Sequence, residues 1–167
     1  MIEMSVYIAN VGKLNEGELV GEWFRLPVDF EDVAEKIGLN SRYKEYAVAR
    51  YELPFEISQD TSIEEINRLC GLVRELEEMF SCDALPELLA SGYFKGIEDL
   101  AQKQESIIHW VGCEDMEDVA RQCVEENGLW NVPERLWNYL DYNTIGQTLE
   151  TGGIFISTRH GIFEVCR

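Results

Sequence analysis

The chain has 167 residues, with 32 Asp and Glu against 14 Lys and Arg, and its formal net charge is −18. This excess argues against nucleic acid or an anionic membrane surface as a partner and favours a basic surface. A hydrophobic fraction of 46%, with four Trp, seven Tyr and seven Phe, requires a packed interior and excludes a disordered acidic tail.

The first 61 residues predict a small α/β unit. Alternating apolar positions indicate three strands, and the first two form a hairpin across a polar loop, Gly12–Gly17. Asp29 can cap a short helix with an acidic first turn, which Gly38 ends. The expected elements are strands Ser5–Val11, Glu18–Leu26 and Glu45–Leu53 and a helix from Asp29 through Ile37, in a ββαβ order.

Residues 62–103 predict helices alone. Thr61/Glu64 and Ser62/Glu65 are two overlapping capping boxes for a helix that runs to about Phe80. Its predicted apolar stripe is Ile63, Ile66, Leu69, Cys70, Val73, Leu76, Met79 and Phe80, and its outer face is Glu64, Glu65, Glu75, Glu77 and Glu78. Pro86 opens a second helix, which Gly92 ends. Ile97–Gln104 is the third, with Glu98 and Asp99 in its first turn.

After a short apolar strand, Ile107–Val111, the chain predicts its most acidic helix, residues 114–126, which Asn127-Gly128 ends. One apolar stripe contains Met116, Val119, Ala120, Cys123 and Val124. The opposite face carries Glu114, Asp115, Glu117, Asp118, Glu125 and Glu126 against one cation, Arg121. Over a length of roughly 20 Å, this density approaches one phosphate per about 3.4 Å of a DNA strand. An ordinary solvated helix face is the alternative.

The stretch Leu129–Tyr142 concentrates aromatic side chains, beginning with Trp130. On a helix expected to start at Pro133, Leu136, Trp137 and Leu140 share one face, whereas Tyr139 and Tyr142 share another. A second apolar face indicates a partner surface, although both faces can also be internal. The remaining expected elements are a helix over Asp141–Glu150, a break at Gly152-Gly153, and strands Ile154–Ser157 and Ile162–Val165 joined by a tight turn at His160-Gly161.

These elements predict an α+β fold of three small domains in a row, and hence an elongated acidic chain. The expected domains are an α/β unit over 1–61, an all-helical unit over 62–103 and an α+β unit over 104–167. The net charges of the three segments are −6, −5 and −7, so the acids are not confined to a tail or a pocket. This spread is what a long acidic surface requires.

The sequence offers little for catalysis or metal binding. The two His residues and the five dispersed cysteines, Cys70, Cys82, Cys113, Cys123 and Cys166, lack zinc spacing, so reduced thiols are expected. His109/Cys113 and His160/Cys166 are conceivable nucleophile pairs but have no orienting acid at a diagnostic spacing. No run reaches the roughly 18–20 apolar residues of a membrane span, and no signal peptide is evident. A small hydrolase with paired carboxylates and a general acidic chaperone for a basic protein remain alternatives.

Several stretches carry a family resemblance: Val6–Lys13, Asn15–Gly21, Tyr51–Phe55, Asp118–Arg121 and Phe155–Thr158. In these, and in a motif formed by Leu136, Tyr139, Asp141, Tyr142 and Leu149, the chain resembles the ArdA-type antirestriction proteins of conjugative elements over almost its full length. The resemblance implies a non-enzymatic DNA mimic without metal or cofactor. It also implies an elongated homodimer that occupies the DNA groove of type I restriction-modification enzymes in the bacterial cytoplasm, with the motif near the dimer interface.

Charge pattern and resemblance together give two candidate sets. The predicted mimic surface is Glu16, Glu18, Glu22, Asp29, Glu31, Asp32, Glu64, Glu65, Glu75, Glu77, Glu78, Glu98, Asp99, Glu114, Asp115, Glu117, Asp118, Glu125 and Glu126. The predicted dimer interface is Trp130, Leu136, Trp137, Tyr139, Asp141, Tyr142 and Leu149. Two features depart from the family pattern: Gln147-Thr148 replace an Arg and an acid, and Arg42, Lys44 and Arg50 add cations near the N-terminus.

Overall fold

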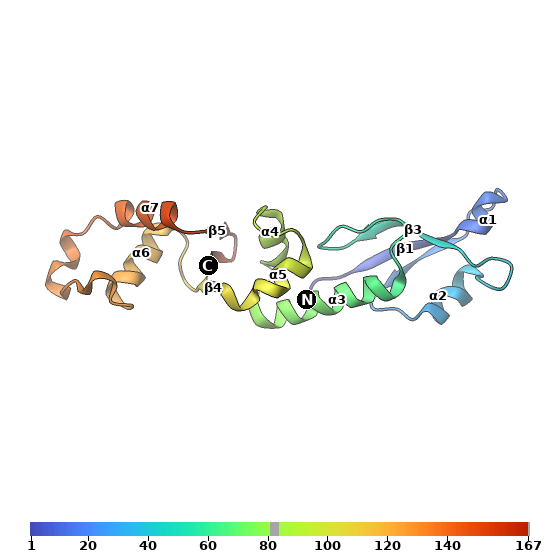
Figure 1. Cartoon of the computed structure of the whole chain (residues 1–167), viewed down its shortest axis with the longest axis horizontal. Coiled ribbons are helices and arrows are strands. Elements are labelled where there is room, and N and C mark those ends of the chain that lie inside the picture. Colours follow the sequence, from blue (N-terminus) through green and yellow to red (C-terminus); the bar gives the residue numbers. More distant parts are fainter. Residues whose placement is uncertain (81–83, 167) are drawn as a thin grey trace. The chain divides into compact units, whose positions relative to one another are not determined.

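The computed structural model of the chain describes residues 1–80 and 84–166. Its fold is mixed α and β, with two three-stranded antiparallel sheets and several helices (Figure 1). The chain divides into two compact units, Met1–Ala101 and Gln102–Arg167. The predicted division into three domains therefore stays a prediction, while the α+β class is confirmed.

The N-terminal sheet has the strand order β2-β1-β3. The strands are β1 (Ser5–Asn10), β2 (Gly21–Arg25) and β3 (Tyr46–Glu52). β1 and β3 are slightly shorter than predicted, whereas β2 is much shorter than the expected Glu18–Leu26 and begins only at Gly21. Val6, Ile8 and Phe24 are buried together with Val33 and Ile37 of helix α2 (Phe30–Ile37). On the sheet, Tyr7 pairs with the exposed Trp23, and their rings meet edge to face at 5.7 Å.

The expected polar loop Gly12–Gly17 is wrong in part, because helix α1 (Val11–Asn15) begins directly after β1. The cause is Asn10, whose Oδ1 accepts a hydrogen bond from the Lys13 amide at 3.1 Å and so caps α1. The side-chain Nδ2 of Asn10 donates to the carbonyl oxygens of Ile37 at 2.9 Å and Gly38 at 3.3 Å. Asn10 is completely buried, and its three hydrogen bonds tie β1, α1 and the end of α2 together.

Helix α2 ends at Gly38 as predicted, in the left-handed conformation with φ of 73°. Asp29 occupies the N-cap position of α2, but its side chain makes no capping hydrogen bond. Glu31 and Asp32 lie in the first turn, where negative charge is favourable next to the unpaired amides. The expected cap is therefore confirmed in position but not in bonding.

Three helices follow: α3 (Ile63–Phe80), α4 (Leu85–Ala90) and α5 (Ile97–Lys103). The predicted apolar stripe of α3 is buried except for Met79, which is exposed. Ser62 accepts from the Glu65 amide at 3.2 Å, whereas Thr61 accepts from the Ser58 amide, so only the second capping box has its expected hydroxyl contact.

Helix α3 runs beside the N-terminal sheet within the first unit (Figure 1). The Asn67 side chain exchanges two hydrogen bonds with the Val28 backbone, at 3.1 and 2.8 Å. Arg74 donates to the Ile2 carbonyl oxygen at 2.7 Å. These contacts join the sheet and α3 in one compact unit.

The C-terminal unit contains the second sheet, with strand order β4-β6-β5. A short 3₁₀ helix η1 (Gln104–Ser106) leads into β4 (Ile107–Trp110), and β5 (Phe155–Thr158) and β6 (Gly161–Val165) form the predicted hairpin. The turn differs from the expectation, because of the expected pair His160-Gly161 only Gly161, the first residue of β6, has a positive φ, of 113°. The turn itself is Arg159-His160.

Two α-helices pack on each other in this unit: α6 (Met116–Glu125) and α7 (Tyr142–Gly152). Val119, Ala120 and Val124 of the predicted stripe are buried, whereas Met116 and Cys123 are half-buried. Gly146 of α7 lies so close to α6 that an added Cβ would be 2.6 Å from the Met116 carbonyl oxygen. Two short 3₁₀ helices, η2 (Leu129–Asn131) and η3 (Glu134–Tyr139), connect α6 to α7.

Cys70, Cys113, Cys123 and Cys166 are free thiols, as expected, while Cys82 lies outside the described residues. Burial raises the pKa of Cys70 to about 11, so this thiol stays protonated and unreactive at neutral pH. Within residues 1–80 and 84–166, no helix is both long enough and apolar enough to span a membrane.

Candidate functional site

Most carboxylates of the predicted acidic surface are exposed, and they come from many elements of both units. The exposed members are Glu16, Glu18, Glu22, Asp29, Glu31, Asp32, Glu64, Glu75, Glu78, Glu98, Glu114, Asp115, Glu117 and Glu126. The half-buried members are Glu65, Glu77, Asp99, Asp118 and Glu125. A partner that binds through positively charged groups would therefore find exposed carboxylates on each of the two units.

Arginines compensate several of the half-buried acids. Arg68 forms ion pairs with Glu65 at 2.6 Å and with Glu98 at 3.0 Å, and its hydrogen bonds lower the pKa of Glu65. Arg121 pairs with Glu125 at 3.5 Å. Glu65, Glu125 and the exposed Glu98 therefore present less net charge to a partner than carboxylates without a nearby cation.

The helical period predicts Glu77 on the outer face of α3, but the structure places this side chain in a largely covered position. Its carboxylate accepts hydrogen bonds from the Ile2 amide and from Arg74, the latter at 2.7 Å, and only 12% of its side chain is exposed. The N-terminal residues cover this part of α3, which the local sequence pattern cannot show. Glu77 therefore stabilises the fold and contributes little to the exposed acidic surface.

The first turn of α6 concentrates acids, as predicted. The Asp115 carboxylate caps the helix by accepting from the Asp118 amide at 2.9 Å, and Asp118 accepts from the Glu114 amide at 3.0 Å. Two of the four acids here thus stabilise the helix start. The side chains of Glu114 and Glu117 remain exposed.

The predicted aromatic interface separates into exposed and internal members. Trp130, Leu136 and Tyr139 are exposed. Trp137 and Leu149 are half-buried against the cluster formed by Ala120, Val124 and Tyr142. The expected helix from Pro133 is instead the 3₁₀ helix η3, which ends before the extended Leu140. Tyr142 then belongs to α7 and is buried, so Tyr139 and Tyr142 do not form the expected common face.

Trp130 is held in an unfavourable backbone conformation. Trp130 and Asn131 have φ angles of 60° and 50°, in the left-handed region that bulky residues avoid. The Asn131 amide donates to the Gly128 carbonyl oxygen at 3.0 Å, and Trp137 donates to the Val132 carbonyl oxygen at 3.0 Å. The loop thus presents an exposed indole at a cost in strain, a combination often found at functional sites. No sequence pattern predicts this conformation.

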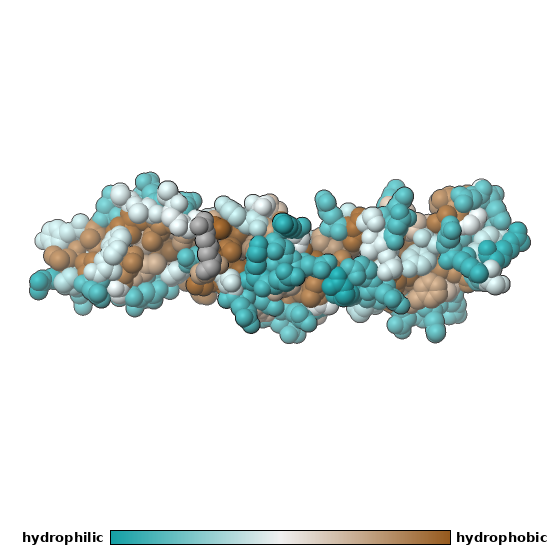
Figure 2. Space-filling view, in the orientation of Figure 1, coloured by the Kyte–Doolittle hydropathy of each residue, from teal (hydrophilic) through white to brown (hydrophobic). Residues whose placement is uncertain are grey.

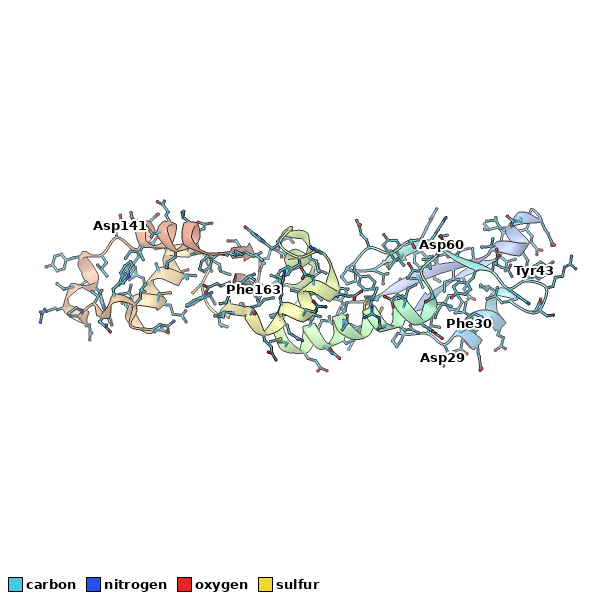
Figure 3. The ribbon with its side chains drawn as sticks, viewed as in Figure 1. Asp29, Phe30, Tyr43, Asp60, Asp141 and Phe163 are labelled. Carbon is cyan, nitrogen blue, oxygen red and sulfur yellow. The ribbon has the colours of Figure 1, made fainter. Side chains whose placement is uncertain are left out.

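Helix α7 begins at Asp141 (Figure 3), which accepts hydrogen bonds from the Thr144 amide at 3.2 Å and the Thr144 hydroxyl at 2.6 Å. These bonds lower the pKa of Asp141. An uncharged side of α7, made of Thr144, Gln147, Thr148, Thr151 and Gly152, lines an open hollow of about 390 Å³. Glu150 of the same helix is also exposed but does not line this hollow.

The polar groups of this uncharged side are largely satisfied within the helix. The hydroxyls of Thr148 and Thr151 donate to the backbone oxygens of Thr144 and Gln147, at 3.0 and 2.9 Å. A partner can therefore cover them without leaving these donors unpaired. Gln147 and Thr148, which depart from the family pattern by replacing an Arg and an acid, are part of this uncharged surface.

The side chains needed for catalysis are not arranged for it. The His109 Nε2 lies 3.0 Å from the His160 carbonyl oxygen and the ring stacks on Phe163, while the Cys113 thiol donates to Gln122. Burial raises the pKa of Cys113, which disfavours the thiolate. Within residues 1–80 and 84–166, no group of three or more His, Cys, Asp or Glu side chains could hold a metal ion.

Comparison with protein families places the chain beside a known family. The family model of the antirestriction protein (ArdA) matches residues 6–164, and so covers nearly the entire chain and parts of both compact units. No curated protein matches the chain.

Proposed function

This chain belongs to the ArdA family of antirestriction proteins, and we propose that it is an acidic DNA mimic that occupies the DNA groove of type I restriction-modification enzymes. As a family member it is an antirestriction protein, is not an enzyme, and has a restriction-modification enzyme as its target. The single observation that carries the mimicry proposal is the set of exposed carboxylates on separate elements of both units. Phosphates along DNA are likewise distributed, not gathered in one pocket.

The charge is sufficient for this role. Two copies of a chain of net charge −18 carry −36, which equals the charge of roughly 60 Å of duplex at one charge per about 1.7 Å. Binding in a basic groove would release the counterions held there, so the affinity should fall steeply as the salt concentration rises.

We further propose a homodimer formed by the exposed hydrophobic side chains Trp130, Leu136 and Tyr139. Two acidic chains repel each other, so a stable contact between them requires a surface without carboxylates. The uncharged side of α7 offers such a surface as well. The internal Trp137, Tyr142 and Leu149 would support this interface from beneath. Tyr139→Asp should shift the protein from dimer to monomer in size-exclusion chromatography without unfolding it, because Tyr139 is 84% exposed.

The three-domain, elongated arrangement predicted from the sequence remains part of this proposal. Small-angle scattering should give a radius of gyration well above that of a compact globule of equal mass. A compact value would remove the basis for a long mimic.

Neutralising the acidic helix tests the mechanism. Glu114, Glu117 and Glu126 have exposed side chains, and Glu126 occupies the C-cap position of α6 through its backbone amide alone, so changing all three to Gln should leave the helix intact. The triple variant should bind the enzyme more weakly and with a shallower salt dependence, whereas Glu114→Gln alone should do little, since one exposed ion pair contributes about 0–1 kcal/mol.

The measurement is the dissociation constant at several salt concentrations, with an unrelated basic protein as the control partner. Binding that hardly depends on salt, or one carboxylate that alone abolishes inhibition, would end the mimicry proposal. Equal affinity for the unrelated basic protein would instead indicate a general acidic chaperone.

A further inference from the structure

One end of the N-terminal unit differs in charge from the rest of the chain. This tip, defined as residues 13–19 and 42–45, contains the cations Lys13, Arg42 and Lys44 and the acids Glu16, Glu18 and Glu45. It is therefore neutral, whereas the whole chain carries −18. A neutral tip gains nothing in a groove built for phosphates, and its three cations would be repelled there.

The tip is ordered by a dense set of contacts around Tyr43, which Figure 3 shows next to α1. The Tyr43 hydroxyl donates to the Glu16 carboxylate at 2.7 Å, and Arg42 donates to its other oxygen at 3.3 Å. The Lys13 Nζ and the Arg42 guanidinium lie 5.7 and 5.2 Å from the centre of the Tyr43 ring. Lys13 and Arg42 are thus held against Tyr43 within the tip itself.

The backbone of the tip is equally constrained. The amides of Glu16 and Glu18 both donate to the Lys13 carbonyl oxygen, at 3.1 and 2.9 Å. Gly17 takes the left-handed conformation, with φ of 89°, and its amide donates to the Leu14 carbonyl oxygen at 3.0 Å. A partner would not have to order this segment on binding, which removes one cost of association.

On this ordered tip two leucines are exposed to solvent. Leu14 is 49% exposed and Leu19 is 71% exposed. Figure 2 shows hydrophobic surface beside hydrophilic surface at the α1 end of the unit. Exposed apolar side chains on a preorganised segment are typical of protein–protein contacts.

We propose that Leu14 and Leu19 dock on a neutral, apolar protein surface of the type I restriction-modification enzyme that lies outside its DNA groove. This inference rests on the proposed function and adds to it a contact that DNA itself cannot make. The carboxylates supply the salt-dependent part of the affinity, and the tip supplies a part that does not depend on salt. The protein can thereby compete with DNA at salt concentrations that lower the affinity of the enzyme for both of them.

The test uses the full-length chain with both leucines changed, Leu14→Ser and Leu19→Ser, and the purified type I enzyme. The dissociation constant should rise at least about tenfold at every salt concentration, because the variant lacks the two exposed leucine side chains that the wild type buries on binding. The slope of affinity against salt should stay that of the wild type. Val111→Ser, at a position that is also 71% exposed but lies in the other unit, is the matched control and should leave affinity unchanged.

Circular dichroism and size-exclusion chromatography must first give the wild-type fold and oligomeric state for the double variant. An unchanged dissociation constant would overturn the inference. Loss of dimer would also overturn it, by making a second copy the occupant, and a shallower salt slope would place the tip inside the groove. A wild-type slope near zero would instead reject the mimicry proposal, so the two failures are distinguishable.

Discussion

A single methyl group at Gly146 should test how closely α7 is packed on α6. In Gly146→Ala the new Cβ would lie 2.6 Å from the Met116 carbonyl oxygen, 2.8 Å from its carbon and 3.2 Å from the Glu117 nitrogen. All three are backbone atoms and cannot rotate away. Helix propensity alone favours Ala by about 1 kcal/mol. Overpacking of this kind costs about 1–3 kcal/mol, and rigid neighbours place the cost at the upper end, so we expect a net loss of about 2 kcal/mol.

The matched control is Gly71→Ala in α3, where the position is exposed and nothing lies within 4 Å of the new Cβ. There the propensity acts without a clash, and stability should rise by up to about 1 kcal/mol. Urea unfolding should be followed by far-UV circular dichroism and, for Gly146→Ala, by tryptophan fluorescence, because Trp110, Trp130 and Trp137 lie in the same unit. If Gly146→Ala is as stable as the wild type, the packing argument is wrong.

Three further predictions concern stability, measured by urea unfolding. Asn10→Leu should cost about 1–3 kcal/mol or more, because it leaves buried hydrogen-bonding groups of β1, α1 and α2 unpaired. Tyr142→Phe should not destabilise the protein, because the buried hydroxyl has no hydrogen-bond partner among the described residues, while the ring still lies 4.3 Å from the Arg121 guanidinium. The pKa of Asp141 is lower in the folded state than in the unfolded chain. The Asp141 carboxylate therefore stabilises the fold at pH values above its unfolded pKa of about 3.9, and this stabilisation is lost as the pH falls through the folded pKa. Asp141→Ala should make the free energy of unfolding depend less on pH in this acidic range.

Much of the fold could be predicted from local patterns. The strands follow alternation, and α3 and α6 follow apolar stripes that bury one helix face, so these elements are visible in the sequence alone. Helix α1 was missed because it depends on Asn10, whose bonds to the end of α2 are set by tertiary structure. The 3₁₀ helix η3 was predicted as an α-helix, because periodicity did not show that Leu140 is extended.

For the candidate surfaces the limit was again tertiary contact. The helical period correctly predicts that Glu75 and Glu78 lie on the solvent-exposed face of α3. It predicts the same for Glu77, but the N-terminal residues cover that side chain. An aromatic-rich stretch predicted exposed side chains, yet could not separate the exposed Tyr139 from the buried Tyr142. The neutral tip was visible in part, as unexpected cations, but its ordering by Glu16 and Tyr43 was not.

The exposed Trp130, Leu136 and Tyr139 make the colloidal behaviour of this protein depend on its charge. At neutral pH the net charge of −18 keeps copies apart except where a specific contact overcomes the repulsion. The sequence pI is about 4.4, so mild acid removes that barrier while the aromatic side chains remain exposed. Concentrated samples should therefore become turbid as the pH approaches this value and clear again above it, because exposed hydrophobic side chains of different copies can meet once the repulsion between the copies is lost.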